Sequence, residues 1–327
     1  MLFATNQNAL REFHVDSPLT EEARETIYKS QNLRGLSVVI EKGTSIPSAS
    51  LPNLTCLQIE CNDASDVPQL LHRATFGKLD SVRFRLESRP IGDFLEAFKV
   101  AALSSSIQDT LSEIFLSTEW SWNPNYSSLL PFTRLVHLNI ESACDDHCSS
   151  VDDDIVIDLS LAIPKLETLV LGDAPCGQFT GGVTAKGLVA LAHNCPDLSS
   201  LIVHFQVASL CDPQTGLETT RDARHTASWT GCALTQLEVG DIPVPEESIS
   251  MVALTLLRIF PRIETISCFS GAWDEIEDVI RRSKRIIDCS SMYHHLTIPR
   301  NFSLTILRSQ PCSPQSNERG TGGTAHD

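Results

Sequence analysis

The sequence is poor in basic residues and has no long apolar run. Its 25 lysines and arginines stand against 41 aspartates and glutamates, which gives a formal net charge of −16. That charge repels polyanions, so we expect neither nucleic acid nor an anionic membrane surface as a partner. No apolar stretch approaches the ~18 residues that span a bilayer, and the N-terminus lacks the pattern of a secretory signal. We therefore expect a cytoplasmic or nuclear protein with a protein partner.

The sequence also lacks the short motifs of nucleotide-binding and hydrolytic sites. It contains no G-x-x-x-x-G-K-[S/T], no G-x-G-x-x-G and no G-x-S-x-G. Its 11 cysteines are an odd number with no regular spacing, which favours free thiols in a reducing compartment over a disulfide framework. We expect no catalytic residue, no cofactor and no enzymatic activity.

One segment carries residue types that bind metals. Cys144-Asp145-Asp146-His147-Cys148 is followed by Asp152-Asp153-Asp154. A structural zinc site usually has two ligand pairs, and a second pair is missing here, so we interpret the aspartates as a solvated acidic loop and expect no metal. The adjacent His294 and His295 would face different directions, and they too predict no ligand pair.

A template of the form apolar-x-x-apolar-x-apolar recurs along the chain. Its spacing varies from 21 residues (Leu33 to Leu54) to 36 residues (Leu198 to Leu234). The ten matches are LREFHV, LRGLSV, LTCLQI, LDSVRF, LSEIFL, LVHLNI, LETLVL, LSSLIV, LTQLEV and IETISC, beginning at Leu10, Leu33, Leu54, Leu79, Leu111, Leu135, Leu166, Leu198, Leu234 and Ile263. A recurrence of this length is the pattern of a repeat protein.

Within each template the apolar positions alternate with other residues, which predicts a strand with one buried face. Val82, Phe84 and Leu86 should point inward, whereas Arg83 and Arg85 should point outward. Outward residues on a fixed sheet are the best candidates for binding a protein. These candidates are Gln58, Glu60, Arg83, Arg85, His137, Asn139, Ile202, His204, Gln236 and Glu238.

The longer units leave room for a helix between strands. Apolar residues at helical spacing predict helices over 185–194, 246–260 and 273–285, and weaker patterns predict them over 92–103 and 18–30. The last of these should open at Ser17-Pro18, because proline is favoured at the first helical position. The shorter units should contain only a turn or a single helical turn.

Units of strand, turn and helix bury their leucines only by stacking on one another. The sequence therefore predicts an α/β leucine-rich-repeat solenoid over residues 1–308, with a curved parallel sheet on the concave face and helices and turns on the convex face. Residues 309–327 are rich in Ser, Gly, Pro and Gln and should form a disordered tail.

The segment GVTAKGLVALAHNCPDLSSLIV (182–203) resembles the cysteine-containing leucine-rich repeats of F-box proteins. The matching residues are Gly187, Leu188, Leu191, Ala192, Cys195, Pro196, Leu198, Leu201 and Val203. The looser resemblance extends from Leu10 to roughly Ser270. It implies a buried, structural Cys195 and a non-catalytic scaffold that holds the substrate of an SCF-type ubiquitin ligase.

No F-box is visible in this sequence, since both Leu51-Pro52 and Leu130-Pro131 lead into strand templates. Because the first template begins at Leu10, we expect that an N-terminal module is missing or that a partner covers this end. A Skp-type adaptor and a cullin would be partners only with an F-box present. The alternative is a free-standing or immune-type repeat scaffold without a ligase link. Trp120 and Trp122 should either anchor a ligand from a long loop or fill a gap between units.

Overall fold

The computed structural model describes residues 10–42, 48–87, 94–120, 122, 124–142, 151–172, 182–211, 231–239, 242–268 and 271–293. The chain divides into two compact units, Met1–Lys284 and Arg285–Asp327. The predictions for Cys144–Cys148, for the adjacent histidines and for the tail from 309 lie outside the described residues. The fold below is that of the first unit.

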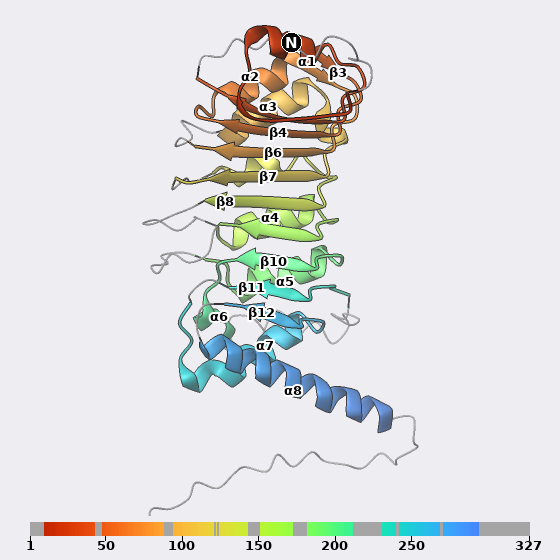
Figure 1. Cartoon of the computed structure of the whole chain (residues 1–327). Coiled ribbons are helices and arrows are strands. Elements are labelled where there is room, and N and C mark those ends of the chain that lie inside the picture. The colour runs from red at the N-terminus through yellow and green to blue at the C-terminus, as the bar shows by residue number, and fades with distance from the viewer. Residues whose placement is uncertain are drawn as a thin grey trace, which may run out of the picture. The chain divides into compact units, whose positions relative to one another are not determined.

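Ten parallel strands form one continuous sheet (Figure 1). Their order is β1-β2-β4-β6-β7-β8-β9-β10-β11-β12, so each strand pairs with the next in the chain. The bounds are β1 Glu12–Pro18, β2 Gly35–Ile40, β4 Cys56–Cys61, β6 Ser81–Leu86, β7 Glu113–Thr118, β8 His137–Ser142, β9 Thr168–Leu171, β10 Ser200–Val203, β11 Gln236–Glu238 and β12 Thr265–Ser267. Each begins two residues after the start of one template, which confirms all ten predicted strands.

The register between neighbouring strands has no shift from β2 to β12. Like positions of the template therefore stack into rows that cross the sheet. One inward row contains Leu57, Val82, Ile114 and Leu138, and all four are buried. Because side chains alternate along a strand, the row formed by the intervening residues faces the other way. The sequence thus folds as an α/β, solenoid-like structure with a long parallel sheet.

Helices follow most of the strands. Their bounds are α1 Glu21–Tyr28, α2 Asp66–Arg73, α3 Phe94–Ser104, α4 Asp153–Ala162, α5 Ala185–Asn194, α6 Val207–Cys211, α7 Ile249–Ile259 and α8 Gly271–Tyr293, with 3-10 turns η2 Ile107–Asp109, η3 Tyr126–Leu129 and η6 Glu246–Ser248. Helices α3, α4 and α5 lie behind the strands in Figure 1. The inward apolar side chains therefore lie between the sheet and the helices. The buried apolar residues of this layer form one cluster from Ile27 to Ile280.

Three predictions about helices were wrong. Ser17 and Pro18 belong to β1, and α1 instead begins after Thr20, whose hydroxyl accepts from the Ala23 N–H at 3.3 Å. The aspartates at 152–154 do not form a loop, because Asp152 caps α4 and the next two occupy its first turn, where the helix dipole favours carboxylates. The short unit after β4 contains the two-turn helix α2, where only a turn or a single helical turn was expected. A helix of eight residues is only about 12 Å long, so it fits even in a short unit.

A second, two-stranded sheet was not predicted. It pairs β3 (Ala49–Leu51) with β5 (Ala74–Phe76) in parallel. Each strand has only three residues, so alternation gives little signal at the level of the sequence. Next to it, a Cβ on Gly77 would lie 2.5 Å from the carbonyl oxygen of Pro52, so this turn has no room for a side chain.

Two buried cysteines complete the turns that precede β10 and β11. The Cys195 thiol lies within hydrogen-bond distance of two carbonyl oxygens, to which it can donate: those of Ser160 (3.8 Å) and Ile163 (3.7 Å). The Cys232 thiol repeats this pattern one unit later with the carbonyls of Cys195 and Leu198. Burial raises the pKa of Cys195 to about 12. Its predicted burial is confirmed, and at neutral pH it remains a protonated thiol.

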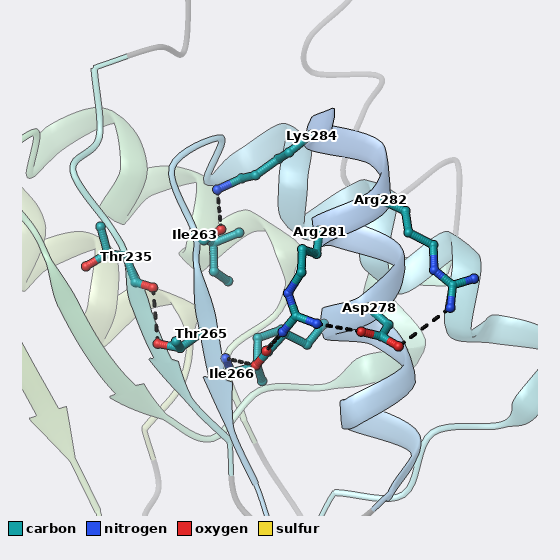
Figure 2. A network of polar contacts seen from close by, with 9 residues as sticks. Thr235, Ile263, Thr265, Ile266, Asp278, Arg281, Arg282 and Lys284 are labelled. Carbon is teal, nitrogen blue, oxygen red and sulfur yellow. Dashed lines mark hydrogen bonds and ion pairs between the residues drawn. The ribbon is translucent and has the colours of Figure 1, made fainter. Parts of the chain in front are cut away.

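Helix α8 covers the last strand of the sheet (Figure 2). The Ile266 N–H of β12 donates to Glu277 Oε2 at 2.8 Å, and the ammonium group of Lys284 donates to the carbonyl oxygen of Ile263. The Glu277 carboxylate is held in turn by Arg281, and the indole of Trp273 is buried and donates to the carbonyl of Ile242 at 2.9 Å. Side chains of α8 therefore satisfy backbone groups that an edge strand leaves unpaired.

Candidate functional site

The outer face is the side of the sheet opposite α3, α4 and α5, and it faces the viewer in Figure 1. Its residues come from the outward positions of the strands. One outward row crosses the sheet through register partners and contains Gln58, Arg83, Phe115, Asn139, Val170, Ile202 and Glu238. Five of the predicted residues in this row (Gln58, Arg83, Asn139, Ile202 and Glu238) are thus brought together by the register.

Arg83 is exposed, as predicted, and is also paired. Its Nη2 lies 2.7 Å from Glu113 Oε1 on the neighbouring strand β7. The other carboxylate oxygen of Glu113 accepts from the Ser81 hydroxyl at 2.8 Å. The guanidinium group is therefore oriented along the sheet and already partly neutralised.

The C-terminal ends of β4, β6 and β7 carry a group that we call the acidic edge: Glu60, Glu87 and Glu119, with Arg85 among them. Arg85 is exposed and lies 3.5 Å from Glu119 Oε1, a longer separation than in the Arg83 pair. A side-chain hydrogen bond with Glu60 raises the pKa of Glu87, and the negative charges of Glu60 and Glu119 add to this effect while Arg85 opposes it. Negative charge at this edge therefore exceeds what Arg85 neutralises.

Trp120 and Trp122 have different environments. The indole of Trp122 is half-buried and lies edge-to-face on Phe94, with the ring centroids 6.1 Å apart. Trp120 is 50% exposed, and its Nε1–H donates to the carbonyl oxygen of Glu87 at 2.7 Å. Trp122 therefore packs against α3 at the margin of the core, whereas Trp120 is fixed beside the acidic edge with half of its surface open to solvent.

The middle strands carry polar residues that contact one another. His137 Nδ1 lies 3.2 Å from the Thr168 hydroxyl, and the Asn139 amide donates to Glu141 Oε1 at 2.8 Å. Asn139 is flanked in its row by Phe115 and Val170, which are apolar residues at outward positions. The outer face therefore changes from charged on β4 and β6 to mixed polar and apolar from β7 to β10.

His204 does not lie on the exposed surface, and that prediction was wrong. It follows the last residue of β10 and is only 8% exposed. The backbone explains the burial, because the Val183 N–H donates to the carbonyl oxygen of His204 at 3.1 Å and brings the chain at 183 alongside. Gln236 on β11 is exposed, as predicted.

Sequence reasoning did not identify Glu87, Phe115 and Glu119 as residues of the outer face. It also did not predict that Trp120 lies beside Glu87. Phe115 and Val170 were overlooked because apolar residues at outward positions break the polar alternation used to find the face. Glu87 and Glu119 lie just beyond the template, but continuing the alternation past Leu86 and Thr118 would have placed both on the outer face.

Within the described part of the chain, no group of three or more His, Cys, Asp or Glu side chains could hold a metal ion. No helix in the described ranges is long and apolar enough to cross a membrane. No protein-family model and no curated protein matches the sequence.

Proposed function

We propose that this protein is a non-catalytic recognition scaffold of the leucine-rich-repeat type that binds another protein on its outer face. The observation that carries the proposal is the long in-register parallel sheet with helices on one side. Its other side presents charged, polar and apolar side chains from successive strands as one array.

Lateral contacts reduce the entropic cost of using this array. Arg83, Asn139 and His137 are each held by a residue on the same or a neighbouring strand. Ordering a long side chain on binding costs about 0.5–1.5 kcal/mol, so side chains that are already oriented lose less. Partly exposed Phe115 and Ile202 supply the apolar contact area that protein interfaces use at their centre.

The finer proposal is a substrate receptor of an SCF-type ubiquitin ligase. It is supported by the unit around α5, where Gly187, Leu188, Leu191 and Cys195 match the cysteine-containing repeat and are all buried. A Skp-type adaptor and a cullin are then the expected partners of an F-box-bearing form of the protein.

Site-specific photo-cross-linking tests the proposed face. A photoreactive amino acid at His137 or Gln236 on the outer face is expected to form an adduct with the same partner protein. At Leu161 or Met251, which are also exposed but lie on α4 and α7, it should form none. The purified partner should then bind the wild-type chain and lose affinity for Ile202→Glu. Adducts that form only from the helical side would refute the proposal.

Co-precipitation separates the ligase role from the alternative. Recovery of a Skp-type adaptor and a cullin with the protein as its own cells produce it supports the substrate receptor. Repeated recovery of the cross-linked partner without either component supports a free-standing scaffold.

A further inference from the structure

The acidic edge is a continuation of the strand ladder rather than a loop feature. The Glu87 N–H donates to the carbonyl oxygen of Cys61 at 3.0 Å, so Glu87 extends β6 by one residue along β4. Glu60 and Arg85 are direct register partners on these two strands. Backbone pairing therefore fixes the positions of Glu60, Arg85 and Glu87 in the sheet, and only their side chains can adjust.

Charge and exposure at this edge favour a cation as the ligand. Three glutamates share this edge with the guanidinium group of Arg85, and the side chains of Arg85 and Glu119 are 57% and 67% exposed. The side-chain hydrogen bond with Glu60 is the main reason why the pKa of Glu87 is raised, and the negative charges of Glu60 and Glu119 raise it further. A cation from outside would relieve this repulsion.

Trp120 adds an independent preference for a cation. Its Nε1–H donates to the carbonyl oxygen of Glu87, and the residue is 50% exposed, so about half of its surface is open to a ligand. The face of an indole is its electron-rich side and attracts ammonium and guanidinium groups, with tryptophan the best of the aromatic residues. Carboxylates and a half-exposed indole together are complementary to lysine or arginine.

An acidic or phosphorylated partner fits this edge less well. It would have to be bound by Arg83 and Arg85, but Arg83 is already paired with Glu113 at 2.7 Å. Arg85 lies among the three glutamates, and the net charge of the chain is −16. Like charges placed in contact across an interface cost several kcal/mol.

We propose that Glu60, Glu87, Glu119 and Trp120 bind a lysine or arginine side chain in a basic segment of the protein partner. This rests on the proposed function, since it names the chemistry of the partner at one end of the outer face. The basic side chain lies against the indole and pairs with the carboxylates, while the rest of the segment runs along β7 toward Phe115.

The test uses a fluorescently labelled peptide of alternating lysine and glycine, with a glutamate–glycine peptide of equal length as the comparison. Fluorescence anisotropy with the full chain should show binding of the lysine peptide alone. The double variant Glu87→Gln/Glu119→Gln should weaken it about five- to tenfold, as two exposed ion pairs are lost. Trp120→Leu should weaken it about threefold, because it removes the aromatic face but keeps an apolar side chain.

The matched control is Glu246→Gln/Glu247→Gln, which removes the same charge from two exposed glutamates before α7. Both double variants change the net charge, and so the long-range field of the chain, by the same amount. The control should nevertheless leave the affinity for the lysine peptide within about twofold of wild type, because its glutamates lie outside the acidic edge. One cooperative thermal transition with a midpoint no lower than that of the wild type shows that the fold of a variant is intact.

Equal losses in the two double variants would overturn the proposal, because only net charge would then matter. Preference for the glutamate peptide, or no binding of the lysine peptide, would overturn it as well. If cross-links still form at His137 and Gln236 in that case, the protein-binding role of the outer face stands and only the cationic partner is refuted.

Discussion

Several side chains on the outer face are held by residues on the same or a neighbouring strand. Arg83 pairs with Glu113, His137 with Thr168, and Asn139 with Glu141. Exposed pairs of this kind contribute only about 0–1 kcal/mol to stability. Their main consequence is orientation, which is what a binding surface requires. The acidic edge differs from them because its charges are not balanced.

The pKa of Glu87 provides a test of the excess of negative charge at the acidic edge. Its raised pKa means that the folded chain holds this proton to a higher pH than the unfolded chain does. Stability should therefore fall as the pH rises from the ordinary carboxyl pKa through the raised one, and then stay at the lower level. Glu60→Gln should lower the pKa of Glu87, because it removes a charge and supplies an N–H donor. Carboxyl-carbon NMR titration measures it.

The groups around Glu87 are Glu60 on β4, Arg85 on β6 and Glu119 after β7. Glu246→Gln is the control and should leave the titration of Glu87 unchanged. An ordinary carboxyl pKa for Glu87 in the wild-type protein would contradict the proposed repulsion.

Gly187 is required by packing rather than by backbone conformation. A Cβ at this position would lie 2.5 Å from Val183 Cγ1 and 2.6 Å from Asp153 Oδ1. Gly187→Ala should therefore destabilise the protein by about 1–3 kcal/mol through overpacking, more than the ~1 kcal/mol that alanine gains within a helix. Urea denaturation measures the difference.

Gly271→Ala is the matched control, because nothing lies within 4 Å of the added Cβ at the start of α8. It should change the free energy of unfolding by no more than about 0.5 kcal/mol. A Gly187→Ala variant that is more stable than wild type would show that Asp153 moves away at little cost. Asp153 would then not be fixed by its bonds to Thr184 at 2.6 and 2.7 Å.

Among the elements, α8 has a role distinct from that of the other helices. The apolar residues Trp273, Ile276 and Ile280 bury its inner side, and Glu277 and Lys284 bind the backbone of β12 and the turn before it. A strand at the edge of a sheet offers unpaired N–H and C=O groups to other chains, and a covering helix prevents such pairing. We infer that α8 ends the sheet by satisfying these groups.

Glu277→Ala should destabilise the protein by about 1–3 kcal/mol, because the Ile266 N–H loses its partner in a partly buried place. Glu275→Ala is the control on the same helix, since Glu275 is exposed. The two midpoints of thermal unfolding provide the comparison. Equal midpoints would mean that water replaces the carboxylate and that the cap contributes little.

For the first unit as a whole, one hydrophobic cluster extends from Ile27 to Ile280. Each strand contributes to it through the same inward positions, so neighbouring repeats share each other's leucines. Repeat proteins are stabilised by such nearest-neighbour interfaces. An unbroken cluster predicts that distant strands unfold together.

Leu57→Ala on β4 and Leu237→Ala on β11 test this cooperativity, because both side chains are buried near opposite ends of the sheet. Each should cost about 2–5 kcal/mol and shift one common urea transition, seen alike by circular dichroism and tryptophan fluorescence. Leu161→Ala, at a side chain that is 63% exposed, should shift it little. Two separated transitions in either core variant would show that the ends unfold independently.

Local patterns were sufficient for the strands and for several helices. The alternation around Val82 and Phe84 predicted inward and outward faces correctly, and helix α5 begins and ends at the predicted residues. These features depend on a residue's near neighbours in the chain, where periodicity and capping act. The same reasoning failed at Ser17 and Pro18, where pairing of β1 with β2 outweighed the preference of proline for a helix start.

The sequence by itself determined ten strands, their buried sides and the position of most outward residues. Only the tertiary structure decided that Glu87 meets Glu60, that Trp120 rather than Trp122 stays open, and that His204 is buried. The physical reason is that each of these depends on a contact between neighbouring units, between residues 21 to 33 positions apart in the sequence. The alternation within one strand carries no information about which residue the adjacent unit places beside it.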